Sequence, residues 1–282
     1  YEACRVGEGW WENEREGVFG IDQFIGIPDL IGRGLGTMVI REFVREIFRK
    51  NSAVEIITDP DPKNLRAICA YEKVGFKSSS EILTPGGKAL LLRLSRADLV
   101  KHRLERFNKS GGSIREINPK SKAELELVVS RMRQTLVDVL GEEKGSSLYS
   151  LEWLRDRVLW HLDAKSTTAK IFLSQDLSGH ITGQAIARIE LSDAGERFGY
   201  FSTLYVEPKF RRGGIANAFL IQVENWFLEM KMPKIVYNTA DSNAKLIDLF
   251  LEHGYRVTIT ESGMVQLTKP TARSDKLRNS GN

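Results

Sequence analysis

The pattern of hydrophobic and polar positions along this 282-residue chain predicts the same three elements twice. Each set has an amphipathic helix with apolar residues three and four apart, then a short apolar run typical of a buried strand. An Asn, another helical segment and a Gly-aromatic pair complete it. The three elements begin at residues 34, 55 and 64 in the first set and at 214, 234 and 243 in the second. Because the spacing stays near 180 residues throughout, we expect a duplicated domain.

The second copy is predicted to be the more complete one. Before its glycine turn we expect helices over 123–140 and 148–162, and strands over 170–174, 181–191 and 198–206. The first copy lacks about 68 residues at the corresponding place. Its sheet is therefore expected to need a second chain, or the second copy, for completion. Each copy should be α/β, with a mixed, mostly antiparallel sheet flanked by helices.

These patterns give the expected domain limits. The prediction is a partial domain over 1–107, a linker over 108–113, a complete domain over 114–270 and a polar, disordered tail over 271–282.

Composition narrows the class of protein. No apolar run reaches the roughly 18 residues of a membrane span. The two cysteines have no disulfide or metal-ligand spacing, so we expect a metal-free protein of a reducing compartment, the cytoplasm. The net charge is +4, yet residues 1–30 hold seven acids and two bases. This local excess favours a small cationic ligand and argues against nucleic acid as ligand of the first copy, and nothing in the chain resembles a nucleic-acid-binding motif; a solvated acidic loop is the alternative.

A glycine-rich turn opens the amphipathic helix in each copy. The free N–H groups of a first helical turn and the helix dipole bind phosphate, and glycine lets the backbone approach it closely. Neither turn has a Walker pattern, and a purely structural glycine turn is the alternative. The candidate phosphate-binding residues are Gly32, Arg33, Gly34, Leu35 and Gly36 in the first copy, and Arg211, Arg212, Gly213, Gly214, Ile215 and Ala216 in the second.

The segment Val206-Glu-Pro-Lys-Phe-Arg-x-x-Gly-x-Ala216 resembles the acetyl-CoA motif of the GCN5-related N-acetyltransferases (GNAT). The Asn64…Tyr71…Gly75-Phe76 segment resembles a later motif of the same family. The resemblance implies acetyl-CoA as cosubstrate for both copies. It adds Phe24, Asn64, Leu204, Val206 and Asn243 to the expected cofactor contacts. The first copy departs from the motif at Ile31, where the family has Arg or Gln, so Arg33 and backbone amides must do more there.

Residues 1 to about 95 also resemble the aminoglycoside 6′-N-acetyltransferases, enzymes of antibiotic resistance. Five ordered blocks carry this likeness: Gly7-Glu-Gly-Trp-Trp-Glu12, Gly20-Ile-Asp-Gln-Phe24, Gly32-Arg-Gly-Leu-Gly-Thr37, Thr58-Asp-Pro60 and Asn64 to Phe76. The resemblance implies acetyl transfer to the 6′-amine of an aminoglycoside by the first copy.

The resemblance, together with that chemistry, implies a role for each residue. Asp22 is the expected base, because an amine must lose a proton before it attacks; an ordinary strand-end carboxylate is the alternative. Tyr71 is the expected proton donor to the leaving thiolate, with a packed core ring as the alternative. Backbone N–H groups around Phe24 are the expected oxyanion donors. The expected substrate contacts are Glu8, Trp10, Trp11 and Asp59.

The second copy keeps the glycine turn but changes the chemistry around it. At the positions equivalent to Asp22, Asp59 and Tyr71, it has Ser202, Asn238 and Phe250. Two interpretations stay open: an acetyltransferase for another small-molecule or peptide amine, and a non-catalytic acetyl-CoA-binding domain. The residues that remain as alternative bases are Glu190, Tyr205 and Glu207.

Overall fold

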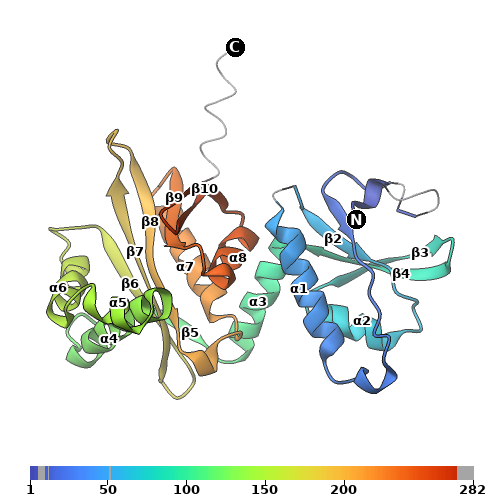
Figure 1. Ribbon diagram of the computed structural model, residues 1–282, viewed down its shortest axis with the longest axis horizontal. Coiled ribbons are helices and arrows are strands. Elements are labelled where there is room, and N and C mark those ends of the chain that lie inside the picture. Colours follow the sequence, from blue (N-terminus) through green and yellow to red (C-terminus); the bar gives the residue numbers. More distant parts are fainter. Residues whose placement is uncertain (6–9, 12, 51, 272–282) are drawn as a thin grey trace, which may run out of the picture. The chain divides into compact units, whose positions relative to one another are not determined.

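The chain folds into two compact units, each built on one β-sheet. The computed structural model describes residues 1–5, 10–11, 13–50 and 52–271 (Figure 1). The first unit comprises residues 1–102 and 251–254, and the second comprises 103–250 and the residues from 255 on. Both sheets mix parallel and antiparallel pairs and are flanked by helices. The predicted tandem α/β fold is confirmed.

The first unit has a four-stranded sheet in the order β1-β2-β4-β3. β1 and β2 are parallel and the other pairs are antiparallel. Beyond β1, a single antiparallel bridge joins Phe19 to Glu2. The strands are β1 (Val18–Gly20), β2 (Glu55–Thr58), β3 (Lys77–Thr84) and β4 (Gly87–Ser95). The helical elements are η1 (Ala3–Arg5), η2 (Pro28–Leu30), α1 (Leu35–Arg49) and α2 (Leu65–Glu72).

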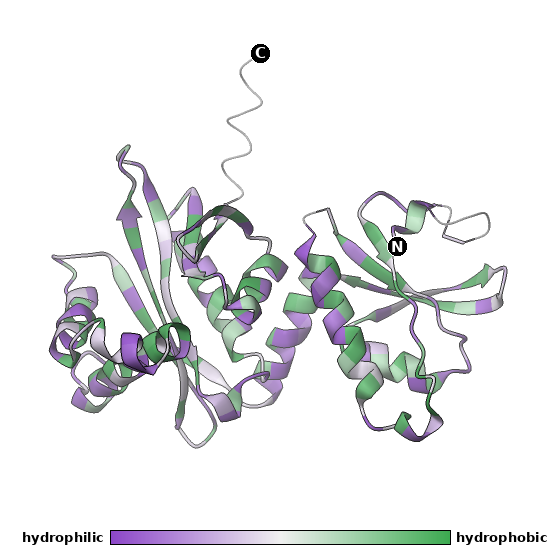
Figure 2. Cartoon of the chain, in the orientation of Figure 1, coloured by the Kyte–Doolittle hydropathy of each residue, from purple (hydrophilic) through white to green (hydrophobic). Residues whose placement is uncertain are grey.

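The apolar face of α1 supplies much of the first core. Its residues Ile40, Val44 and Phe48 are each at most 2% exposed and belong to one cluster with Leu92 and Leu94 of β4. The opposite face of α1 carries charged residues (Figure 2). Burial of this stripe holds the helix, and with it the glycine turn at its start, against the sheet.

The second unit has a seven-stranded sheet in the order β10-β11-β9-β8-β7-β6-β5. Only β8 and β9 are parallel among its pairs. The strands are β5 (Ser113–Glu116), β6 (Ala169–Gln175), β7 (Ile181–Leu191), β8 (Arg197–Val206), β9 (Lys234–Ala240), β10 (Arg256–Glu261) and β11 (Met264–Pro270). The helical elements are α4 (Lys122–Leu140), α5 (Glu142–Ser147), α6 (Leu151–Leu162), η3 (Pro208–Phe210), α7 (Ile215–Glu229) and α8 (Ala244–Glu252).

Helices cover both faces of this second sheet. The group α4–α6 lies on one face and α7 lies on the other (Figure 1). Val128 of α4 and Val158 of α6 are fully buried against Ile186 of β7. On the other face, Phe219 and Phe227 of α7 are fully buried. The sheet between these two layers carries the residues discussed below.

Several element limits differ from the sequence-based expectation. Helix α3 (Arg96–Lys109) was not expected; it reaches into the predicted linker, and β5 begins at the last residue of that linker. The helix expected to start at residue 148 starts at Leu151, and α5 precedes it. Thr271, the first residue of the predicted tail, is buried and donates a 2.5 Å hydrogen bond to the Met232 carbonyl. Residues 272–282 lie outside the described residues.

Candidate functional site

The two units share one strand register at the place where their parallel strands separate. In the first unit, Phe19 pairs with Ile56 and Gly20 with Ile57. In the second, Gly199 pairs with Ile235, Tyr200 with Val236 and Phe201 with Tyr237. Allowing for the repeat spacing, the first two pairs of the second unit are the two pairs of the first. Ile21, the equivalent of Phe201, still donates its N–H to the Ile57 carbonyl, so Asp22 and Ser202 are the residues that follow where contact between the parallel strands ends.

The glycine turn of the first unit has an open, uncapped helix start. Gly34 is the N-cap of α1 with φ +81°, and no side chain caps the helix. A Cβ added at Gly34 would meet no atom within 4 Å. Gly32 also has a positive φ, and Arg33 between the two glycines is exposed. Unpaired N–H groups at an accessible helix start fit an anionic group such as a pyrophosphate.

Asp22 lies just past β1 and is held by the first residue of the chain. The Tyr1 hydroxyl donates a 2.6 Å hydrogen bond to Asp22 Oδ2. Burial and the neighbouring Asp22 raise the pKa of Tyr1, so this hydroxyl stays protonated as a donor. Asp22 itself is exposed. Tyr1 could not be recognised in the sequence, because a tyrosine ahead of any recognisable motif gives no signal.

Asp59 follows β2 and is the second carboxylate of this site. Burial, together with the negative charge of Asp22, raises its pKa to about 6. The Trp11 side chain donates toward this carboxylate and offsets part of the rise. A carboxylate that burial still destabilises is stabilised further by a cationic ligand. The pair Asp22 and Asp59 therefore forms an acidic site suited to a cationic group.

The two tryptophans predicted to bind substrate have different surroundings. Trp11 is 9% exposed, stacks on Tyr1 with ring centroids 5.4 Å apart, and packs in a small core cluster with Val18. Trp10 is half-buried and meets Trp11 edge to face. Trp11 thus walls the acidic site from the core side, and Trp10 presents the more accessible ring. Glu8 lies outside the described residues.

Tyr71 lies on α2 and is 5% exposed. Its hydroxyl accepts a 2.8 Å hydrogen bond from Gln23 Nε2. Burial raises its pKa, and the charges of Asp22 and Asp59 add to that effect. The phenol is therefore protonated at neutral pH and placed in the field of both carboxylates.

The other residues of the first unit that were predicted to bind the cofactor make local contacts within the fold or are exposed. Asn64 is the N-cap of α2, and its side chain accepts a 3.1 Å hydrogen bond from the Ala67 N–H. Phe24 is 92% exposed. Leu35 and Gly36 form the first turn of α1 and are half-buried.

The second glycine turn repeats the backbone of the first in a more crowded setting. Gly214 has φ +90° and is the uncapped N-cap of α7. A Cβ added there would lie 2.4 Å from the Arg103 carbonyl oxygen of α3. The Arg211 guanidinium donates hydrogen bonds to the Val206 carbonyl and to the Asp138 carboxylate. Arg212, with φ +68°, and Ile215, which is buried, complete the turn with the half-buried Gly213 and Ala216.

The remaining predicted contacts of the second unit lie on β8 and near β9. Leu204 is buried and Val206 is half-buried. Asn243 directs its side-chain amide to the Thr239 hydroxyl at 3.2 Å.

The three alternative bases of the second unit lie in different places. Glu190 pairs with Arg188, whose guanidinium also donates a 2.7 Å hydrogen bond to the Ser202 hydroxyl. Glu207 binds Arg131 and His180, and Arg131 also lies over the Tyr205 ring. Glu190 is thus the carboxylate linked to the position that corresponds to Asp22. Arg188 was missed in the sequence because a lone arginine in a strand reads as an ordinary edge residue.

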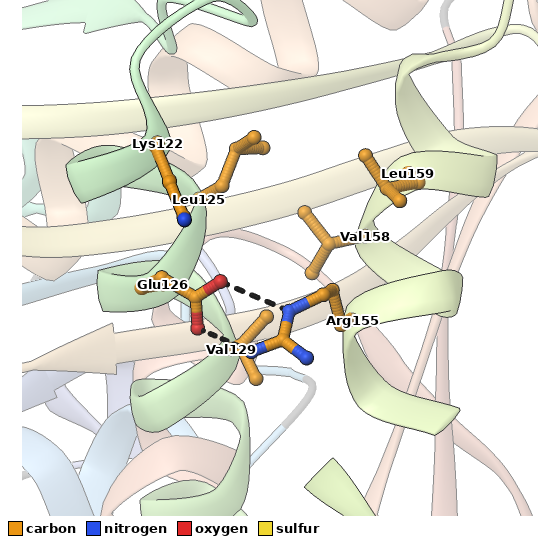
Figure 3. Close-up of a pocket in the computed structure, with 7 residues that line it drawn as sticks. All are labelled: Lys122, Leu125, Glu126, Val129, Arg155, Val158 and Leu159. Atoms are coloured by element: carbon orange, nitrogen blue, oxygen red, sulfur yellow. Dashed lines mark hydrogen bonds and ion pairs between the residues drawn. The ribbon is translucent and has the colours of Figure 1, made fainter. Parts of the chain in front are cut away.

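A separate cavity of about 440 Å³ lies between α4 and α6. Figure 3 shows its apolar lining and the bidentate ion pair between Glu126 and Arg155, with N–O distances of 2.9 and 2.8 Å. Its seven lining residues are Lys122, Leu125, Glu126, Val129, Arg155, Val158 and Leu159. No residue at either glycine turn lines it, and Glu126 and Arg155 satisfy each other.

Among the described residues, no cluster of three or more His, Cys, Asp or Glu is placed to hold a metal ion. None of the helices in the described ranges has the length and hydropathy to cross a membrane.

Comparison with known families agrees with the duplicated architecture. The acetyltransferase (GNAT) domain matches residues 3–84, and the acetyltransferase (GNAT) family matches residues 133–255. Both copies found in the sequence are thus matched separately, by two models of the same kind of protein.

The curated relatives match the first unit. The aminoglycoside N(6′)-acetyltransferase type 1 of Klebsiella pneumoniae is 44% identical over 93 residues, which are 33% of this chain and 46% of that protein. The chain therefore spans about half the length of that relative. The kanamycin resistance protein of Rhizobium radiobacter is 44% identical over 84 residues, 29% of this chain and 78% of that protein. Among solved structures, the aminoglycoside acetyltransferase AAC(6′)-Ib in complex with coenzyme A is 41% identical, covering 36% of this chain and 60% of its own, with a TM-score of 0.35.

Proposed function

Because this chain belongs to the GNAT acetyltransferase family, we propose that its first unit transfers acetyl from acetyl-CoA to an amine of a cationic amino sugar, the 6′-amine of an aminoglycoside. The observation that carries this is the pair Asp22 and Asp59 in a unit that also has an open glycine turn. The pair offers negative charge where the parallel strands separate, and the turn offers N–H groups to a pyrophosphate. The names of the curated relatives support the same substrate class.

The chemistry follows from the groups present. An aminoglycoside amine arrives mainly as an ammonium ion and must lose one proton to attack. Asp22, with Asp59 beside it, holds the ammonium and accepts that proton. A pKa of about 6 makes the Asp59 carboxylate a stronger base than an ordinary one while leaving it ionised at pH 7.

The amine nitrogen then attacks the thioester carbon. As the C–S bond breaks, the thiolate leaves and needs a proton. Tyr71 supplies it and regains one from the amine, which has become an amide. Gln23 keeps the Tyr71 hydroxyl in position by its hydrogen bond.

The test is a thiol-release assay on the full chain with acetyl-CoA and kanamycin. Asp22→Asn should lower kcat about a hundredfold, since it removes the base without changing its shape. Asp61→Asn is the matched control: Asp61 is exposed and caps the Lys63 N–H, which Asn also does. Equal turnover by the unmodified chain and Asp22→Asn would overturn the proposal, and so would absence of turnover in a chain that binds both substrates.

We propose a different role for the second unit, which keeps the glycine turn but has Ser202, Asn238 and Phe250 in place of Asp22, Asp59 and Tyr71. It would bind acetyl-CoA without acetylating aminoglycosides. In the full chain, Asp22→Asn should therefore remove kanamycin turnover while a second, weaker acetyl-CoA site stays measurable by calorimetry. Residual kanamycin turnover that Arg188→Gln abolishes would contradict this.

A further inference from the structure

Tyr1 and Arg188 occupy the same register position in the two units. Gly20 donates its N–H to the Tyr1 carbonyl, and Arg188 is the cross-strand partner of Tyr200. Gly20 and Tyr200 are equivalent in the parallel register, so their neighbours are too. Tyr1 offers its hydroxyl to a carboxylate, whereas Arg188 offers a guanidinium to the Ser202 hydroxyl. The same position has thus changed from supporting an acid to carrying a cation.

Arg188 is held firmly in its place. It is 9% exposed, its Nε donates a 2.6 Å hydrogen bond to Glu190, and its guanidinium lies 4.4 Å from the centre of the Tyr200 ring. The negative charge of Glu190 neutralises the positive charge of Arg188.

A second guanidinium, that of Arg157 on α6, shares the single negative charge of Glu190 with Arg188 and has no ion pair of its own among the described residues. Arg157 is half-buried, lies 4.0 Å from the centre of the Trp160 ring, and has no carboxylate within 4.0 Å among the described residues. Burial lowers its pKa, and the positive charge of Arg188 adds to that effect. A half-buried cation that another cation destabilises is relieved by an anionic ligand.

His161, one turn after Arg157, adds an unused acceptor. Its Nδ1 lies 2.6 Å from the Arg157 carbonyl oxygen, and because a carbonyl only accepts, Nδ1 must carry the proton. Nε2 is then a lone-pair acceptor, buried and without a partner among the described residues. Burial and the charges of Arg188 and Arg157 lower the His161 pKa to about 4, so the ring is neutral at pH 7. It therefore adds no positive charge to that of the two arginines.

We propose that the second unit binds an acceptor amine that carries a carboxylate, with Arg157 binding the carboxylate beside the Arg188–Glu190 pair. This rests on the proposed function only in placing acetyl-CoA in the same unit. The charged and titratable groups that act on Arg157 are Arg188, Glu190, His161, Tyr149 and Tyr200, so Arg157 and Arg188 together are two cations against the one anion Glu190. The first unit has the reverse arrangement, with Asp22 and Asp59. The two units would therefore take acceptors of opposite charge.

The test uses the full chain carrying Asp22→Asn, so that the first unit is silent. Calorimetry measures Kd for a series of ω-amino acids from glycine to 6-aminohexanoate, for 1,4-diaminobutane and 1,6-diaminohexane, and for O-phosphoethanolamine. At least one amino acid should bind tenfold or more tightly than the diamine of the same length. Arg157→Gln should weaken that binding about tenfold to a hundredfold, the usual worth of a charged hydrogen bond.

Arg155→Gln is the matched control, because Arg155 lies on the same helix, is exposed, and pairs with Glu126 (Figure 3). It should leave every Kd unchanged. Diamines binding as tightly as amino acids, no amino acid binding at all, or equal effects of the two substitutions would each overturn the proposal. If only O-phosphoethanolamine bound, the ligand group of the site would be a phosphate and not a carboxylate, and the proposal would be overturned as stated. Thiol release with kanamycin, run on the unmodified chain, tests the proposed function separately.

Discussion

The rings of Tyr237 and Phe250 stack in the second unit with centroids 4.0 Å apart and planes 3° apart. Phe250 is fully buried and stands where the first unit has Tyr71. A ring at this position therefore packs well without a hydroxyl. The hydroxyl of Tyr71 is an addition to a position that the fold fills with an aromatic ring in either unit.

Tyr71→Phe should accordingly separate packing from chemistry. The ring stays, while the hydrogen bonds of the hydroxyl with Gln23 and Thr58 are lost, so the free energy of unfolding should fall by about 1–2 kcal/mol. If the hydroxyl protonates the leaving thiolate, kcat with kanamycin should fall about a hundredfold. Thiol release and urea denaturation measure the two effects. A variant with unchanged kcat would leave Tyr71 a packing residue.

Asp59 should make the first unit less stable as pH rises from about 4 to 6. Its pKa is about 6 in the folded chain and near 4 when unfolded, so the folded state binds the proton more tightly. The contribution of Asp59 to the free energy of unfolding is fully present below pH 4 and is lost as pH rises through 6. After allowance for partial exposure, the loss is about 1–2 kcal/mol.

Asp59→Asn should remove this part of the pH dependence and stabilise the chain at pH 7. Urea denaturation at pH 4.5 and pH 7 measures it, with Asp61→Asn as the exposed control. The idea fails if Asp59→Asn lowers stability at pH 7, since that would mean the ionised carboxylate is satisfied in the folded chain.

Alanine should be tolerated differently in the two glycine turns. At Gly34 it meets open space and costs about 1 kcal/mol for the left-handed backbone. At Gly214 it has the same strain, and its Cβ also falls 2.4 Å from the Arg103 carbonyl, so we expect a loss of about 2–4 kcal/mol. Urea denaturation of the two variants compares them directly, and equal losses would contradict the close approach of α3 to this turn.

Arg131 should be among the costlier side chains to remove. It is 4% exposed and donates hydrogen bonds of 2.5 Å to the Ile181 carbonyl and to Glu207. Arg131→Met leaves both acceptors short of a donor and should lower the free energy of unfolding by about 3 kcal/mol. The control is Arg155→Met, which breaks an exposed ion pair and should change stability little. Similar small losses in both variants, seen by urea denaturation, would count against a stabilising role for the buried pair.

The repeat could be predicted from the sequence because the motifs that identify it are short stretches of neighbouring residues. Glycine turns, buried strands and Gly-aromatic pairs keep their spacing, and the shared strand register confirms it. Helix α3 escaped prediction because charged residues dominate it and few apolar positions, such as Leu99 and Phe107, mark a face. The roles of Tyr1, Arg157 and His161 depend on contacts across the fold. No spacing along the chain encodes such contacts.

The matched register has a practical consequence for protein engineering. The segment from Gly20 to Gly36 has the same length as that from Tyr200 to Ala216, and both run from a paired strand position through a left-handed glycine into a helix. A transplant of one segment into the other unit would enter and leave at matching backbone positions. Such chimeras would move Asp22 or Ser202 together with its glycine turn and leave Asp59, Arg157 and Arg188 in place, so they would separate the contribution of the turn segment to acceptor preference from that of the surrounding charges.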